Sequence, residues 1–184
     1  MERRSRKDRD LTITGNGMSV GGEFNKVRIT GEGAVDGDLT CNRLRALGQI
    51  DVAGDLHSDV VKVLGQLSVK GDCNAESFHV RGTFRIGGLL NSGKIEVRLL
   101  GPCEAMEIGG GQIHIKGILH GIGAHKYLTV DTVEGDNIRL ACTHAKVVRG
   151  NRVEIGPGCD IDLVEYKDVF RQSRQAIVKS SQRV

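Results

Sequence analysis

Histidine and cysteine are the residue types in this chain with the clearest capacity for metal binding or nucleophilic chemistry. They are scattered along the 184 residues, as His57, His79, His114, His120, His125, His144, Cys41, Cys73, Cys103, Cys142 and Cys159. The nearest approaches to a metal-binding pair are Cys142 with His144 and His120 with His125, and neither forms an HExxH or CxxC pattern. A zinc site needs four convergent ligands. We therefore interpret these side chains as outward-facing or buried strand residues and expect no metal site.

Two glycine-rich segments resemble functional loops. The triple glycine at 109–111 lacks the Lys-Ser/Thr pair and the helix start that follow in a phosphate-binding loop. The Gly-Pro-Gly-Cys segment at 156–159 has no neighbouring base that would activate the thiol of Cys159. We interpret both segments as corners or turns. We expect no catalytic residues, no cofactor and no enzymatic activity.

A repeat of 17 residues determines the expected fold. Two glycine series have this spacing, Gly31, Gly48, Gly65 and Gly82, and Gly37, Gly54, Gly71 and Gly88. The units KVRITGEGAVDGDLTCN, RLRALGQIDVAGDLHSD, VVKVLGQLSVKGDCNAE and SFHVRGTFRIGGLLNSG align without gaps. Between the glycines, apolar residues alternate with polar ones, which is the pattern of a strand with one face buried. Glycine allows the chain to turn sharply between such strands.

The repeat predicts an all-β fold, because no helical crossover fits between these glycines. We expect a single-stranded parallel β-helix, a triangular solenoid of about nine coils of ~17 residues. The predicted β-helix domain covers residues 11–165, with a divergent first coil at 11–25 that contains one extra residue before Met18. We expect residues 1–10 to be a disordered basic tail and residues 166–184 to be a basic tail or a short capping helix. A β-sandwich would need hairpin turns that a fixed period does not predict.

Composition and charge narrow the function classes. Aromatic residues make up only 3% of the chain, so Val, Ile and Leu must fill the core. The net charge is +3, and both predicted tails are basic, which leaves the body mildly acidic. The tails are either solvated or contact an acidic surface such as lipid headgroups or a client protein. The chain starts with no signal peptide, so we expect a cytoplasmic location, with association to the inner face of the cell membrane as an open alternative.

The repeat resembles that of the bactofilins, which are bacterial cytoskeletal proteins. The resemblance rests on GQIDVAGDL (48–56), GQLSVKGDC (65–73) and the closing stretch VEGDNIRLACTHAKVVRGNRVEIGPGCDIDLVEYKD (133–168). It implies a right-handed triangular β-helix, polymerisation without nucleotide, and a scaffold role for proteins of cell shape, envelope growth or motility. Some members of the family bind the inner membrane through a hydrophobic N-terminal peptide, whereas residues 1–10 have no hydrophobic residue after Met1.

The ends of a solenoid also favour self-association on physical grounds. Each end exposes a strand edge with unpaired backbone groups, and solenoids need polar caps to remain monomeric. The predicted polymerisation interface comprises Leu11, Ile13, Met18, Val20, Phe24, Ile161, Leu163 and Phe170. The expected partner is a second copy of the chain, and no nucleic acid is expected.

Two other functions remain open. A monomeric β-helix could present a flat sheet face to a partner as a binding or adaptor module. Left-handed β-helix acyltransferases are also triangular solenoids and use a catalytic histidine, but their hexapeptide repeat gives 18 residues per coil. The spacing of 17 held over four units argues against that class.

Overall fold

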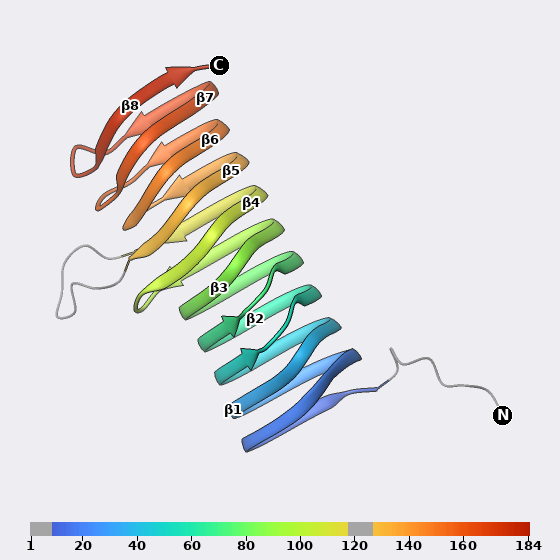
Figure 1. Ribbon diagram of the computed structural model, residues 1–184. Helices are drawn as coiled ribbons and strands as arrows, with labels where there is room; N and C mark the ends of the chain where they lie inside the picture. Colours follow the sequence, from blue (N-terminus) through green and yellow to red (C-terminus); the bar gives the residue numbers. More distant parts are fainter. Residues whose placement is uncertain (1–8, 118–126) are drawn as a thin grey trace.

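The chain is wound into a solenoid in which every strand lies parallel to the next (Figure 1). The computed structural model describes residues 9–117 and 127–184. The strands are β1 (Leu11–Val52), β2 (Leu56–Val69), β3 (Cys73–Leu99), β4 (Cys103–Lys116), β5 (Leu128–Leu140), β6 (Thr143–Ile155), β7 (Asp160–Gln172) and β8 (Ile177–Arg183). They form one sheet in the order β1 to β8. The predicted fold class, an all-β parallel β-helix, is confirmed.

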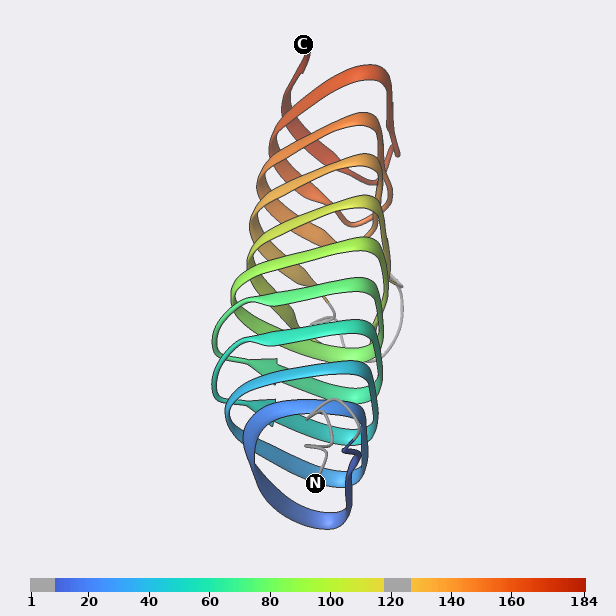
Figure 2. The same cartoon turned by 90° about the vertical axis from the view of Figure 1, so that its right-hand side faces the viewer.

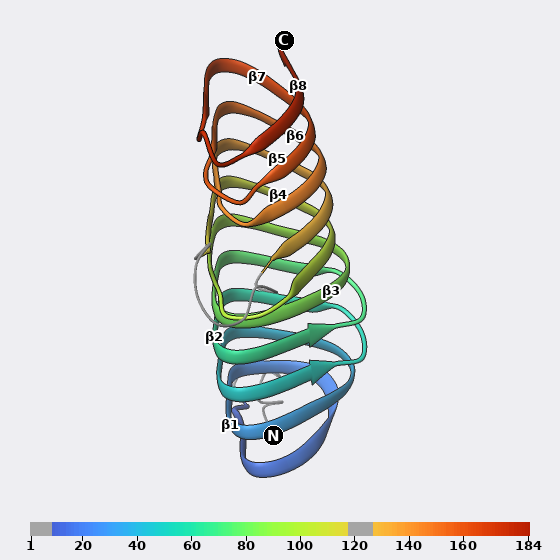
Figure 3. The same cartoon turned by 90° about the vertical axis from the view of Figure 1, so that its left-hand side faces the viewer.

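The 17-residue repeat sets the register of the sheet. Leu39 pairs with Leu56, and Leu56 pairs with Cys73, so the partners are 17 residues apart in this part of the chain. The spacing changes further along, because Ile95 pairs with Ile113, and β3 contains a register shift after Ile86. Views from both sides show the coils stacked from β1 at one end to β8 at the other (Figures 2 and 3). The strict repeat and its loosening beyond residue 98 are therefore both visible in the register.

The core is a stack of inward-facing aliphatic side chains inside the coils. One inward column contains Leu44, Val61 and Phe78, all with no exposed surface. Phe78 packs edge-to-face against Phe84, with the ring centroids 5.8 Å apart. Burying each such side chain contributes roughly 1.5–3 kcal/mol of transfer free energy. The column explains why the core needs few aromatic residues.

Glycine is required at one corner because the coils approach each other there. Gly65 has φ of +134°, a conformation that side chains with a Cβ rarely adopt. A Cβ atom built on Gly65 would overlap the carbonyl oxygen of Gly48 in the preceding coil. Gly48 and Gly82 have the same relation to the glycine one coil before them. The glycine column therefore fixes how closely the coils stack.

An aspartate ladder lines a second corner. Asp38 Oδ1 accepts a hydrogen bond from the backbone N–H of Asp55, Asp55 Oδ1 from that of Asp72, and Asp72 Oδ1 from that of Leu89. Each donor–acceptor distance is 2.8 Å. The side chains satisfy backbone donors where the chain turns and interrupts the strand ladder. The Gly-Asp pairs of the repeat thus have a structural role.

The prediction for the C-terminal segment is wrong. Residues 166–184 were expected to form a basic tail or a short capping helix, but β7 continues to Gln172 and β8 pairs with it in parallel. Phe170 and Val178 pack against the core and supply the apolar contacts of this last coil. Sequence reasoning missed it because the segment has no glycine and its inward positions are partly polar. The predicted tail at 1–10 lies largely outside the described residues; Arg9 and Asp10 are exposed and precede β1.

Candidate functional site

The cysteines are buried and behave as small apolar side chains. All five are free thiols in the core. Burial raises the pKa of Cys73 and of Cys103 to about 12 and that of Cys159 to about 11, so these thiols stay protonated at neutral pH. The Gly-Pro-Gly-Cys segment at 156–159 includes a turn, as its sequence predicts. The structure therefore gives no support for a reactive thiolate at Cys73, Cys103 or Cys159.

The histidines do not converge with other ligand-type side chains. Over residues 9–117 and 127–184, no group of three or more His, Cys, Asp or Glu side chains is placed to hold a metal ion. Cys142 is buried, whereas His144 is exposed and its ring meets that of Tyr127 at 4.8 Å between centroids. His120 and His125 lie outside the described residues. In the same described ranges, no helix is long and apolar enough to cross a membrane.

His79 and His114 lie on one outer face of the solenoid. His79 Nδ1 is 3.1 Å from Glu96 Oε2, and its other ring nitrogen is 2.6 Å from the hydroxyl of Ser77. Partial burial lowers the pKa of His114, and the nearby charges of Lys116 and Arg139 lower it further, which favours the neutral imidazole. His114 lines a surface hollow of about 410 Å³ that holds no cysteine or serine among its described lining residues. The described lining of this hollow is polar and contains no thiol or hydroxyl group.

Among the described residues, the N-terminal end of the solenoid is a strand edge without a partner. The first coil of β1 packs Leu11 and Ile13 towards the interior, and Ile13 is 8% exposed. No described segment pairs with the outer edge of this coil, whereas on its inner side the N–H of Asn25, in the next coil, donates to the carbonyl of Arg9. Phe24 is only 3% exposed because the Arg9 guanidinium covers its ring at 4.7 Å from the centroid. Leu11, Ile13 and Phe24 thus lie in the terminal coil, as the sequence predicts.

Met18 and Val20 are placed differently from the prediction. They are 76% and 72% exposed and point outward from the side of the first coil, whereas Gly17 and Ser19 are half-buried. The alternation of inward and outward residues keeps the same phase from Ile13 to Ser19, so the structure has no extra residue before Met18. Because a shift of one residue exchanges the two faces of a strand, the assumed insertion placed Met18 and Val20 on the wrong face.

The C-terminal end differs from the prediction in position and polarity. Ile161 and Leu163 lie one coil inside the end, because Val178 and Ser180 of β8 pair with them. Phe170 does belong to the last coil, where its ring stacks on Tyr166 with centroids 5.4 Å apart. Gln172 pairs with the buried Ile155, and Ser181 pairs with the buried Val164. Polar residues therefore replace apolar ones at these positions of the last coil. The available signal for this coil in the sequence was the alignment of Phe170 with Val153 and of Val178 with Ile161.

Comparison with known proteins finds relatives that match only part of this chain. Residues of this chain match two uncharacterized proteins of Bacillus subtilis, YhbE at 48% identity over 54 residues and YhbF at 42% identity over 79 residues. The matches cover 29% and 42% of this chain, and 23% and 34% of the two relatives. The chain thus matches about a third or less of each relative's length. No family model and no solved structure matches the chain.

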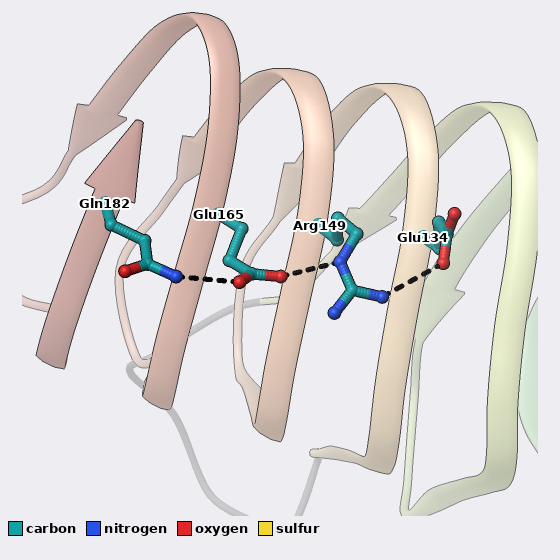
Figure 4. A network of polar contacts seen from close by, with 4 residues as sticks. All are labelled: Glu134, Arg149, Glu165 and Gln182. Carbon is teal, nitrogen blue, oxygen red and sulfur yellow. Dashed lines mark hydrogen bonds and ion pairs between the residues drawn. The ribbon is translucent and has the colours of Figure 1, made fainter. Parts of the chain in front are cut away.

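A chain of polar contacts links the last four coils (Figure 4). Arg149 donates from Nε to Glu165 Oε2 at 2.6 Å and from Nη1 to Glu134 Oε2 at 3.4 Å. Gln182 donates from Nε2 to the other oxygen of Glu165 at 2.8 Å. These contacts lower the pKa of Glu165, with the Arg149 hydrogen bond as the largest cause. The ionised carboxylate therefore connects β8 to β6.

Acidification is expected to loosen the C-terminal coils through Glu165. The pKa of Glu165 is lower in the folded chain than in the unfolded chain, so its contribution to stability is present above its ordinary value of 4.5 and is lost as the pH falls through the folded value. Hydrogen exchange of β8 amides between about pH 5 and pH 3 would measure the loss. Glu165→Gln should flatten this pH dependence, whereas Glu107→Gln should leave it unchanged. An equal slope in Glu165→Gln and in the wild type would refute the assignment.

Proposed function

We propose that the protein is a structural scaffold that self-assembles end to end into nucleotide-independent filaments. The role corresponds to that of the bactofilins, which its repeat resembles, and it would organise proteins of cell shape, envelope or motility at the cytoplasmic side of a bacterial membrane. The observation that carries the proposal is the open parallel edge of the first coil. A second copy placed against it would continue the sheet at the coil spacing of ~4.8 Å.

The residues behind this edge support stacking. Leu11 and Ile13 face the interior of a coil that no described segment covers, so a neighbouring copy would remove further apolar surface from water. The free backbone donors and acceptors of the same coil would find partners in the neighbour. The proposed role requires no catalytic group, metal or cofactor.

One observation favours the second candidate, a monomeric binding or adaptor module. In the last coil, the exposed polar residues Gln172 and Ser181 occupy the positions that align with the buried Ile155 and Val164, and solenoids need polar terminal coils to remain soluble as monomers. An adaptor would remain a discrete particle at all concentrations. Filaments and an adaptor therefore differ in a direct measurement of particle size.

Ile13→Lys is expected to reduce filament formation at least tenfold without unfolding the rod. The lysine can extend through the open end into water, but a stacked copy would bury its ammonium group. Negative-stain microscopy and sedimentation without nucleotide would measure the loss. Thr12→Lys is the matched control, because Thr12 is exposed on the side of the same strand.

Two outcomes would contradict the proposal. Wild-type protein that stays in small discrete particles at every concentration would favour the adaptor. Filaments of Ile13→Lys that equal those of the wild type and of Thr12→Lys would exclude the first coil as the stacking surface.

A further inference from the structure

The outward side chains of the coils divide into faces of opposite charge. The basic face comprises Arg43, Arg45, Lys62, Arg81, Arg98 and Lys116. His79 and Glu96 lie on the same face, where the carboxylate of Glu96 pairs with His79 and Lys94. Register pairs Arg45 with Lys62 and Arg98 with Lys116, so these side chains form rows along the rod. The acidic face comprises Asp38, Asp55, Asp59, Asp72, Glu76 and Glu107. The Asp38–Asp55–Asp72 ladder defines its central row.

Over the described residues, the charges of these two faces form no ion pairs, although Asp38, Asp55 and Asp72 accept hydrogen bonds from backbone N–H groups. None of the six cations and none of the six carboxylates takes part in an ion pair over the described residues. Elsewhere, outward charges do pair between coils, as Lys146 with Asp131 at 2.9 Å and Lys179 with Asp162 at 2.6 Å. Most ion pairs of the described residues thus lie beyond residue 130, whereas the six cations and six carboxylates of the two faces remain without one.

The two faces match each other in spacing. The charged side chains of both faces are spaced by whole coils of ~4.8 Å along the rod, with His79 and Glu96 between the cations and Leu89 between Asp72 and Glu107. Two neighbouring leucines, Leu47 and Leu64, are 42% and 49% exposed between the cations and add apolar surface to the basic face. Complementary charge on one repeat length favours docking between copies and suppresses docking of like faces.

We propose that the basic face of one copy docks on the acidic face of a second copy, so that rods associate side by side. The contact is heterologous, and each copy keeps one of the two faces free for a further neighbour. Its charged part spans about five coils of ~17 Å width, which buries roughly 800 Å² over both partners and gives a weak contact between single subunits. Filaments would repeat the contact along their length and bundle. This step rests on the proposed function.

Charge reversal of one face at a time tests the docking. The first variant is Arg45→Glu with Lys62→Glu, and the second is Asp59→Lys with Glu76→Lys; all four side chains are outward-facing and exposed. We expect wild-type bundles at about 50 mM salt and single filaments at about 0.5 M, where screening is strong. Each variant alone should lose the bundles and keep its filaments. An equal mixture of the two variants should regain bundles, because each reversed face then meets a complementary face.

The outcomes separate this proposal from end-to-end assembly and from other partners. Single filaments at both salt concentrations, or a mixture that fails to restore bundles, would overturn side-by-side docking and leave the filament proposal intact. If the wild type forms no filaments, salt-dependent association of the mixture in light scattering still reports the docking. Binding of the wild type to phosphatidylglycerol vesicles, abolished by Arg45→Glu with Lys62→Glu but without complementation in the mixture, would assign the basic face to lipid instead.

Discussion

Gly65→Val is expected to destabilise the solenoid by about 3–5 kcal/mol. The φ of +134° costs a side chain with a Cβ roughly 1–3 kcal/mol, and the Cβ would overlap the carbonyl oxygen of Gly48. Relief of the overlap requires two coils to separate, which disturbs the packing of the core between them by a further 1–3 kcal/mol or so. Denaturant unfolding followed by circular dichroism would measure the loss.

Gly22→Val is the matched control for Gly65→Val. Gly22 has φ of +143°, but a Cβ built on it would meet no atom within 4 Å. Only the backbone cost remains there, so we expect a loss of about 1–2 kcal/mol. Equal losses in the two variants would mean that close coil stacking at Gly65 has no energetic importance.

Phe78→Ala is expected to destabilise the protein by about 3–5 kcal/mol, the usual range for a buried phenylalanine. Phe78 has no exposed surface, and the cavity would also remove the edge-to-face contact with Phe84. The neighbouring coils are held by their own ladders and cannot collapse into the space. The change is measurable as a shift of the denaturant midpoint.

Phe170→Ala is the control for Phe78→Ala, because Phe170 is half-buried in the last coil. We expect a smaller loss of about 1–2 kcal/mol, and exchange measurements should locate it in β7 and β8. A loss in Phe78→Ala no greater than this would show that the interior column is less tightly packed than its burial indicates.

The fold was predictable from the sequence because one corner admits only glycine. The regular spacing of Gly48, Gly65 and Gly82 marks the corner at which the backbones of successive coils approach too closely for a Cβ atom. The last coil was missed because it lacks this signal, and its order depends on hydrogen bonds to β7 and on Phe170. The alternation of inward and outward residues is a reliable local signal, but it cannot show where the outermost coil ends.

The end residues were predicted in part. Leu11 and Ile13 could be assigned because the first coil continues the alternation, whereas Met18 and Val20 were misplaced by the assumption of an extra residue. The contact between the Arg9 guanidinium and the Phe24 ring leaves no pattern in the sequence, because it depends on how Arg9, just before β1, is placed against the first coil. Ile161 and Leu163 were assigned to the end only because β8 was not foreseen.

The single parallel sheet has a mechanical consequence. Its backbone hydrogen bonds run along the axis of the rod, so a pulling force between β1 and β8 acts directly on the bonds between two coils and not on many coils in shear. The coils can then detach one after another, and each detached coil of the strict repeat releases 17 residues, roughly 55–60 Å of extended chain. The rod is stiff in compression but extensible under tension, and a load applied at its ends would lengthen it stepwise before any single large rupture.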